Sequence, residues 1–378
     1  MKILFLINSI PPEYGGGYLR VFKTAARFKE YDWLYKIATF TKREKYTTNI
    51  RNIKINDILF LKGFLFTSLF YLPWHIIKYR SKFDVFYVAS VRWYSTIPSL
   101  IAKILGKKVI HGVTLSLVDS PAGKPSSIFK VPYYWFKNCQ FKIADFIFVN
   151  SPLVQKECIS CGYDEKVVKL INNPVDTQKF RLVSNEEKRN LLVANDLPVD
   201  AFTILFVGSF NKRKGCDLFP ILFKILFSKT STKINFIMCG QKGYPETNSI
   251  LSELDGIFRE SGNTLKIMEE VSDTSKYYKM SNLFLFPTTN EGLPNVVLEA
   301  MASGCMILCN LLPGITDYIL SDVFIVKNND ITEYVERIID YIDNQPRFQH
   351  LIERNRKKIE DSFSIENVDS TIQQILNS

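Results

Sequence analysis

Short apolar segments alternate along the chain with longer segments in which apolar residues recur at helical spacing. The short segments are apolar at almost every position, which is typical of strands covered on both faces of a parallel sheet. Parallel strands need helix-length connections, so the pattern predicts an α/β fold. The predicted strands cover residues 2–7, 35–40, 85–89, 109–112, 202–208, 233–240, 265–271, 283–287 and 306–309, and two more lie within residues 141–151 and 167–176. The predicted helices cover residues 59–78, 96–105, 152–161, 272–280, 294–303, 331–342, 346–362 and 365–376, and a further helix contains residues 19–28.

The series of strands and helices occurs twice, and the polar run Thr177–Arg189 between the two series is the best candidate for a linker. A chain of 378 residues is long enough for two domains of ordinary size. We therefore predict a Rossmann-like domain over residues 1–175 and a second one over residues 176–357. Open α/β sheets bind ligands at the carboxyl ends of their strands, so the candidate chemistry is sought there.

The positive charge is unevenly placed. Residues 1–180 hold 27 Lys and Arg against 12 Asp and Glu, a net charge of +15, whereas residues 181–378 hold 21 against 26, or −5. Such an asymmetry indicates a negatively charged partner near the first half: membrane phospholipid, a lipid-phosphate acceptor or nucleic acid. Scattered solvated charge is the alternative. Nucleic acid is the weakest candidate, because the basic half shows no recognised binding motif with interleaved aromatics.

The most apolar run, residues 59–77, includes Lys62, Pro73 and His75 and falls short of the ~20 apolar residues of a membrane-spanning helix. Its aromatic residues could lie against a bilayer surface, or the run could be a buried core helix. The seven cysteines, an odd number, and an opening segment too short for a secretory signal predict a protein of the reducing cytoplasm.

A glycine loop and a helix follow the predicted strand 283–287. Pro294 and Gly304 stand where a helix favours its first residue and its stop. Asn295 and Glu299, four residues apart, share one helical face. Glu291 precedes the helix, and Gly292 lets the backbone direct free N–H groups at an anion, where the helix dipole also favours negative charge.

This arrangement suits a sugar nucleotide. One carboxylate can accept hydrogen bonds from the sugar hydroxyls, the backbone N–H groups can hold a diphosphate, and the second carboxylate can accept from a ribose. A second cationic feature follows the strand that ends at Gly208, where Lys212, Arg213 and Lys214 can neutralise a diphosphate. A solvated basic turn is the alternative for these three residues.

The Glu-x7-Glu spacing, with Glu-Gly-Leu-Pro and Leu-Glu-Ala-Met-Ala-Ser-Gly around it, resembles the signature of family 4 retaining glycosyltransferases. The resemblance implies two Rossmann-like domains that face each other across a cleft (GT-B type), with a last helix at residues 358–378 crossing back to the first domain. It implies transfer of a hexose from a UDP- or GDP-linked sugar to a saccharide or lipid-linked acceptor, in surface polysaccharide or glycolipid synthesis. No cofactor or metal is expected, and the chain contains no Asp-x-Asp sequence.

The resemblance also implies roles for individual residues. Glu291 would hold the donor sugar and Glu299 the ribose, while Lys214 matches a lysine that grips the phosphates. Ser209 stands where the family usually has an arginine, and we expect Arg213 to supply that charge. The rest of the motif implies donor contacts for Gly292, Leu293, Pro294, Asn295 and Val296.

Two further features of the first half resemble the family. Gly16 and Gly17 match a Gly-Gly pair that lets the donor or acceptor approach the backbone, although a plain turn is the alternative. His111 at the end of a strand matches a histidine close to the donor sugar. From the residues alone, His111 would be a hydrogen-bonded strand-end histidine.

Two other functions remain open. A sugar-nucleotide epimerase of the same fold would need no acceptor, and a non-catalytic scaffold would bind nucleotide or an anionic membrane without turnover.

Overall fold

The computed structural model describes residues 1–10, 16–45, 53–113, 120–123, 127–269, 271, 273–291, 293–312 and 325–377. The chain separates into two compact units, Met1–Asn172 (unit 1) and Asn173–Ser378 (unit 2). The division lies three residues before the predicted boundary, since 175 − 172 = 3. Residues 358–378, expected to cross to the first domain, group with unit 2, and the crossing itself stays a prediction.

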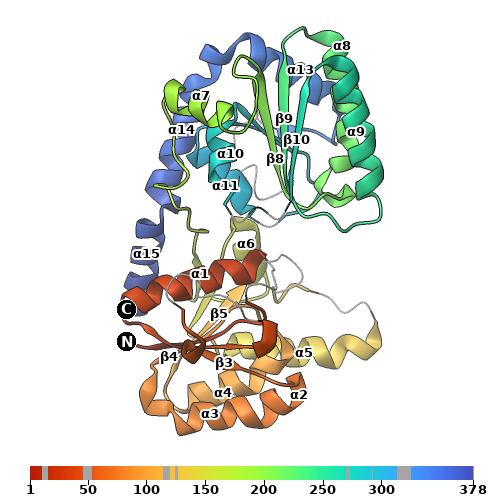
Figure 1. Cartoon of the computed structure of the whole chain (residues 1–378). Helices are drawn as coiled ribbons and strands as arrows, with labels where there is room; N and C mark the ends of the chain where they lie inside the picture. The colour runs from red at the N-terminus through yellow and green to blue at the C-terminus, as the bar shows by residue number, and fades with distance from the viewer. Residues whose placement is uncertain are drawn as a thin grey trace. The chain divides into compact units, whose positions relative to one another are not determined.

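Unit 1 is built on a seven-stranded sheet in which every described pairing is parallel (Figure 1). The strand order is β3-β2-β1-β4-β5-β6-β7, so the sheet extends from β1 and β4 toward both edges. Its strands are β1 (Ile3–Leu6), β2 (Leu34–Thr39), β3 (Ile58–Phe60), β4 (Val85–Val88), β5 (Lys108–Val113), β6 (Phe146–Val149) and β7 (Val168–Leu170).

Helices cover both faces of this sheet. Helix α1 packs on one face, where Phe28 meets Phe5 of β1, and α3 and α4 lie on the other (Figure 1). The helices are α1 (Gly16–Glu30), α2 (Phe64–Phe66), α3 (Leu72–Lys78), α4 (Thr96–Ile104), α5 (Val131–Cys139) and α6 (Pro152–Ser160). Both faces of the central strands are therefore buried, as their apolar sequences predict.

The predicted helix over residues 59–78 is wrong in its first part. Residues Ile58–Phe60 form the edge strand β3, and Gly63 has a φ of +64°, which a helix interior does not allow. The helical part begins at Phe64, passes through a π-helical segment η3 (Thr67–Tyr71) and ends with α3. An unbroken apolar run does not distinguish a short buried strand from a helix.

Unit 2 contains a six-stranded parallel sheet in the order β10-β9-β8-β11-β12-β13. Its strands are β8 (Phe202–Val207), β9 (Ile234–Gly240), β10 (Thr264–Glu269), β11 (Leu283–Phe286), β12 (Met306–Asn310) and β13 (Ile325–Val326). Its helices are α7 (Asn185–Val193), α8 (Phe219–Lys229), α9 (Thr247–Ser261), α10 (Ser275–Met280), α11 (Asn295–Ala302), α13 (Ile331–Asp343), α14 (Gln345–Phe363) and α15 (Ile365–Asn377). The group α8, α9 and α13 lies on one face of the sheet, and α7, α10, α11 and α14 on the other (Figure 1).

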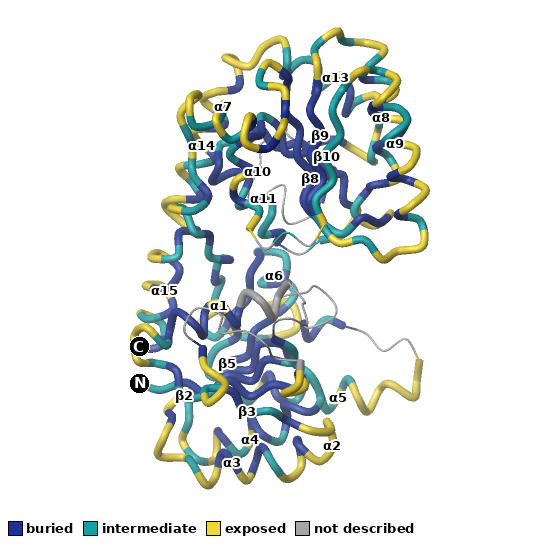
Figure 2. The backbone as a smooth tube through the Cα atoms, viewed as in Figure 1, coloured by how far each residue is buried: buried dark blue, intermediate teal, exposed yellow. Residues whose placement is uncertain are grey.

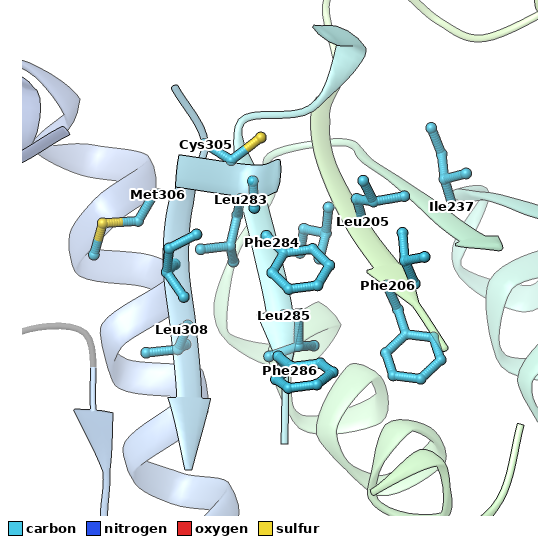
Figure 3. Packing of buried hydrophobic residues seen from close by; sticks show 14 of the residues in the cluster. Leu205, Phe206, Ile237, Leu283, Phe284, Leu285, Phe286, Cys305, Met306 and Leu308 are labelled. Carbon is cyan, nitrogen blue, oxygen red and sulfur yellow. The ribbon is translucent and has the colours of Figure 1, made fainter. Parts of the chain in front are cut away.

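The core of unit 2 lies on both sides of its central strands. Leu205 and Phe206 of β8 pack beside Leu285 and Phe286 of β11 (Figure 3), and all four side chains are buried. Figure 2 shows the same division in both units, with buried strands and exposed outer helix faces. Burial of apolar surface stabilises by about 25 cal/mol per Å², so these side chains favour the packing of helices on β8 and β11.

Two predictions for unit 2 need correction. The linker candidate Thr177–Arg189 is partly helical, because α7 begins at Asn185 and Ser184 caps it by accepting a hydrogen bond from the Glu187 backbone N–H at 3.1 Å. Helix α9 is absent from the prediction, although Ile250, Leu254 and Phe258 recur on one of its faces.

Candidate functional site

The candidate site of unit 2 lies at the carboxyl ends of β8 and β11. These parallel strands are neighbours in the sheet, with Leu283 paired to Ile204 and Phe284 to Leu205. Because neighbouring parallel strands end at the same edge, the turns that follow them meet. The sequence places the basic turn, Lys212–Lys214, after β8. It places the loop that contains Glu291, here called the glutamate loop, after β11, so this topology brings the two together.

The basic turn has a defined shape. Lys212–Lys214 form one turn of 3₁₀-helix, and the side-chain oxygen of Asn211 caps it by accepting a hydrogen bond from the Lys214 backbone N–H at 3.0 Å. Gly215 ends the turn in the left-handed region, with a φ of +75°. The segment is therefore held by its own caps, so that Arg213 and Lys214 leave it at fixed positions.

Backbone contacts tie the turn to the end of β11. The Arg213 carbonyl oxygen accepts a hydrogen bond from the Thr289 backbone N–H at 3.0 Å and from the Thr288 hydroxyl at 3.1 Å. Thr288 is completely buried, and its hydroxyl also lies 3.4 Å from a Glu291 carboxylate oxygen. Thr288 thus connects the main chain of the basic turn with the acid opposite it.

Three charged side chains meet at this edge. The Glu291 Oε1 atom accepts hydrogen bonds from Arg213 Nη1 at 2.8 Å and from Lys214 Nζ. Arg213 Nη1 also donates to the Asn290 carbonyl oxygen at 2.8 Å. The side chains of Lys214 and Glu291 are 12% and 17% exposed and that of Arg213 is 50% exposed, so Lys214 forms the inner member of the cluster and Arg213 the outer one.

Lys214 lies in partly apolar surroundings. Its ammonium group stands 5.0 Å from the ring centroid of Phe286, the last residue of β11. Its alkyl chain passes Gly208, where an added methyl group would lie 3.6 Å from Lys214 Cδ. Phe286 of β11 and Gly208 after β8 therefore flank the Lys214 side chain, whose ammonium group reaches Glu291.

The start of α11 is fixed by a residue of another segment. Pro294 caps the helix with a φ of −77° and a ψ of 117°. The buried Asn173 side-chain amide donates to the Leu293 carbonyl oxygen at 2.9 Å and to the Asn295 side-chain oxygen at 2.8 Å. The first turn of α11 and the loop before it are therefore anchored to the first residue of unit 2.

Glu299 lies on α11 beside Tyr278. Burial and, next, the negative charge of Glu299 raise the pKa of the Tyr278 hydroxyl well above its ordinary value. Glu299 itself is half-buried, on the same helix as Asn295. Gly304, with a φ of +76°, follows the last turn and stops the helix as predicted. The proposed contact of Glu299 with a ribose stays a prediction.

The remaining motif residues take different positions around this edge. Leu293 and Pro294 are buried, whereas Val296 and Ser209 are partly exposed. Ser209 follows the end of β8, and its carbonyl oxygen accepts from the Asn211 backbone N–H at 3.0 Å. Gly292 lies outside the described residues.

His111 lies inside unit 1. Its side chain is completely buried on β5, and its Nε2 atom is 3.1 Å from the Ser99 hydroxyl of α4. Burial lowers the pKa of His111 to about 3, so the ring is neutral at physiological pH. This is the hydrogen-bonded histidine that the residues alone indicate, and its proposed place close to the donor sugar stays a prediction.

Gly16 and Gly17 form the first two residues of α1. Their proposed contact with a donor or acceptor stays a prediction. Among the predicted site residues, the structure thus brings Glu291, Lys214 and Arg213 into direct contact.

Sequence reasoning missed Thr288 and Asn173. The signal for Thr288 is its place directly after Pro287, at the carboxyl end of a buried strand. Asn173 belongs to the sequence Asn-Pro-Val-Asp, which resembles the family's Asn-Gly-Val-Asp, but no spacing rule links it to residues 120 positions later.

The sequence is similar to those of known proteins. Residues 187–358 match the family described as glycosyl transferases group 1. The chain is similar to the capsular polysaccharide biosynthesis glycosyltransferase CapM of Staphylococcus aureus, with 27% identity over 66% of this chain and 65% of the relative. It is also similar to an uncharacterized glycosyltransferase of Haemophilus influenzae, with 28% identity over 50% of this chain and 54% of the relative. The matches thus span less than two thirds of these relatives' lengths.

The fold is shared with solved structures. Alr3699/HepE of Anabaena in complex with UDP matches with a TM-score of 0.79 and 17% identity over 100% of both chains. A glycosyltransferase of Rickettsia africae matches with a TM-score of 0.76 and 15% identity over 99% of this chain and 97% of that one. These likenesses confirm the predicted α/β class with two Rossmann-like domains of the GT-B type. The segment that matches the glycosyl transferases group 1 family, residues 187–358, lies within unit 2.

Proposed function

We propose that this chain is a retaining glycosyltransferase that moves a hexose from a nucleoside diphosphate sugar to an acceptor hydroxyl. The observation that carries the proposal is the contact of Arg213 and Lys214 with one oxygen of Glu291. It lies at the carboxyl edge of the unit 2 sheet and inside the segment that matches the family. An α/β sheet binds its ligands at that edge.

The charges of the cluster suit a leaving diphosphate. Two cations face one carboxylate, so the three side chains carry a net charge of +1. A diphosphate would take over hydrogen bonds from the cations and release the Glu291 carboxylate toward the donor sugar. Preorganised cations that meet the charge developing on a leaving group are a main source of catalysis in such sites. Because Lys214 is largely shielded from water, its attraction to the diphosphate is stronger than that of a solvated lysine.

The two acids would then divide the donor between them. Glu291 would bind hydroxyls of the hexose, and Glu299, eight residues further along the chain, would accept from the ribose. Positioning of donor and acceptor would supply much of the remaining rate enhancement. We further propose that the protein cations take the place of a divalent metal, so that transfer needs no cofactor.

The comparisons support the proposed donor and acceptor classes. HepE has been solved in complex with UDP and glucose, and CapM is named for capsular polysaccharide biosynthesis. A UDP-linked hexose is therefore the first donor to test and a GDP-linked one the second. We propose a saccharide or lipid-linked acceptor, for surface polysaccharide or glycolipid synthesis. Action in the cytoplasm fits the seven cysteines, which are free thiols in the structure.

A panel of nucleotide sugars tests the proposal. We expect one donor to raise the thermal unfolding temperature more than the others, because selective binding stabilises the folded state. With that donor, release of nucleoside diphosphate should depend on added acceptor, whereas an epimerase would turn over without one. Proton NMR of the product should show the anomeric configuration of the donor. Binding without turnover across a broad acceptor panel, or an inverted product, would refute the proposal.

A further inference from the structure

Unit 1 exposes large apolar side chains on one group of helices. The outward positions include Phe66, Phe70 and Trp74 in the segment from α2 to α3, and Ile104 at the end of α4. A second set surrounds α5, where Phe129 is 91% exposed and Trp135 is 69% exposed. We name these six residues the apolar surface. The buried-helix alternative for residues 59–77 is therefore wrong for this outward face, although it holds for Leu72 and Ile76.

The helices that carry the apolar surface form one layer. Helix α3 packs on α4, and α4 packs on α5, on the side of the sheet opposite α1. Figure 1 shows α2, α3 and α4 together below the sheet, and Figure 2 shows exposed stretches on α2, α3 and α5. Several large apolar side chains exposed on one layer of helices indicate an interaction site, since such a surface is costly in water.

The same segment carries the positive charge of the chain. Residues 58–143 contain 12 Lys and Arg but only Asp84 and Asp119 as acids, so their net charge is 12 − 2 = +10. This equals the net charge of the whole chain, and the remaining residues sum to zero. One exposed cation contacts the apolar surface, since the Lys78 ammonium lies 4.5 Å from the Trp74 ring centroid. Lys62, Lys82 and Lys130, in the same stretch of sequence, are also exposed.

We propose that the apolar surface docks unit 1 on an anionic phospholipid bilayer. Aromatic rings would enter the headgroup region, where Trp and Tyr are enriched, and the surrounding lysines would pair with lipid phosphates. A protein partner fits less well, because the cores of protein interfaces are depleted in lysine. Within the described residues, no helix is long and apolar enough to cross a membrane, so the contact proposed is with the bilayer surface.

Vesicle flotation tests the proposal on the full chain. We expect the protein to float with vesicles of phosphatidylcholine and phosphatidylglycerol at a ratio of about 7:3, and to remain with the soluble fraction when vesicles are phosphatidylcholine alone. Binding should weaken at least tenfold at ~0.5 M NaCl, because the Debye length falls to a few ångströms. Equal binding to both vesicle types, or none to either, would overturn the proposal.

Paired substitutions locate the surface. F66S/F70S and F129S/W135S should each lower the partition coefficient more than tenfold, and K78E/K82E should do the same because each lysine near an anionic surface contributes about fivefold. The matched controls change exposed residues of unit 2: V193S/I221S for the apolar pairs and K224E/K229E for the charges. Equal losses in test and control variants would refute the assignment.

The apolar surface could instead join two copies of the chain. Sedimentation equilibrium separates the outcomes: a lipid-docking surface leaves the protein monomeric without vesicles, whereas a dimer that F66S/F70S dissociates would overturn the proposal. Donor binding, measured as a thermal shift, should be unchanged in the surface variants, so failure of membrane docking is distinguishable from failure of the proposed transferase activity.

Discussion

Gly215 lies against Pro287 with no room for a side chain. A methyl group on Gly215 would lie 2.3 Å from the Pro287 carbonyl oxygen, and the backbone at Gly215 is left-handed, with a φ of +75°. This contact joins the end of the basic turn to the residue that follows β11. It sets how closely Arg213 and Lys214 approach Glu291.

Replacing Gly215 by alanine should therefore disturb both stability and the site. The left-handed backbone alone costs about 1–2 kcal/mol for a residue with a Cβ atom, and the contact with Pro287 forces the turn away from β11. We expect the free energy of unfolding to fall by about 2–4 kcal/mol and nucleoside diphosphate affinity to fall with it. Urea unfolding and calorimetric titration measure the two effects.

Gly262→Ala is the matched control. Gly262 also has a left-handed backbone, but an added methyl group there would meet only the flexible Lys233 ammonium, at 3.3 Å. Gly262→Ala should lose about 1–2 kcal/mol of stability and keep its nucleotide affinity. Equal effects of the two substitutions would contradict the role given to the Gly215–Pro287 contact.

Glu291→Gln should separate product binding from transfer. The amide keeps the shape of the side chain but removes the charge that pairs with Arg213 and Lys214. We expect transfer to fall more than tenfold, or about 1.4 kcal/mol of barrier, while nucleoside diphosphate binds at least as tightly, because no carboxylate competes for the cations. Steady-state kinetics and calorimetry give the two quantities.

Glu246→Gln controls for a general effect of charge near the turn, since Glu246 accepts a hydrogen bond from the Lys212 backbone N–H at 3.3 Å. It should leave transfer within about twofold of the wild type. An unchanged rate in Glu291→Gln would end the catalytic interpretation of this acid.

The strands were accessible from the sequence because buried parallel strands are apolar at almost every position, and β8, β9 and β11 lie where the pattern predicts them. The basic turn and the glutamate loop were also identifiable, since cations and glycines follow strand ends. The pairing of Arg213 with Glu291 could not be predicted from the sequence, because it depends on the order of strands in the sheet. The contacts of Asn173 depend on which polar backbone groups of a distant loop remain unpaired after folding.

Lys214 should contribute more to diphosphate binding than Arg213. Its side chain is largely buried beside Phe286, whereas Arg213 is half-exposed and screened by water. We expect Lys214→Ala to weaken nucleoside diphosphate binding about tenfold or more and Arg213→Ala about threefold, by calorimetry at constant salt. Lys212→Ala is the control in the same turn and should change affinity by less than twofold. Unchanged affinity in both of the first two variants would discard the assignment of this turn to the phosphates.

Asn173 should act as a positioning residue for the start of α11. Asn173→Ala leaves the Leu293 carbonyl oxygen without its side-chain donor in a buried place, which costs about 1–3 kcal/mol. Asn235→Ala is the control, because its buried amide donates to the Pro198 carbonyl oxygen at 2.9 Å, away from the glutamate loop. Both should lose similar stability, but only Asn173→Ala should raise the KM for the donor. A raised KM in both variants would show a general effect of destabilisation.

His111 should make the folded state sensitive to acid. Burial lowers its pKa to about 3 from an ordinary value of 6.5, so between these values the unfolded chain binds a proton that the folded chain does not. The contribution of neutral His111 to the free energy of unfolding is therefore fully present above pH 6.5. It is lost as the pH falls, by about 1.4 kcal/mol at pH 5.5. Burial also lowers the pKa of His75, to about 4, which adds a loss of stability of the same sign.

Urea unfolding of the wild type at pH 7.5 and 5.5 should show the loss of stability from both histidines. The variant His111→Asn should show only the loss that comes from His75. Because the substitution also changes packing, the difference between the two pH values is the quantity to compare. An equal difference in His111→Asn and the wild type would mean that His111 is accessible to protons in the folded protein, which would contradict the effect of burial on its pKa.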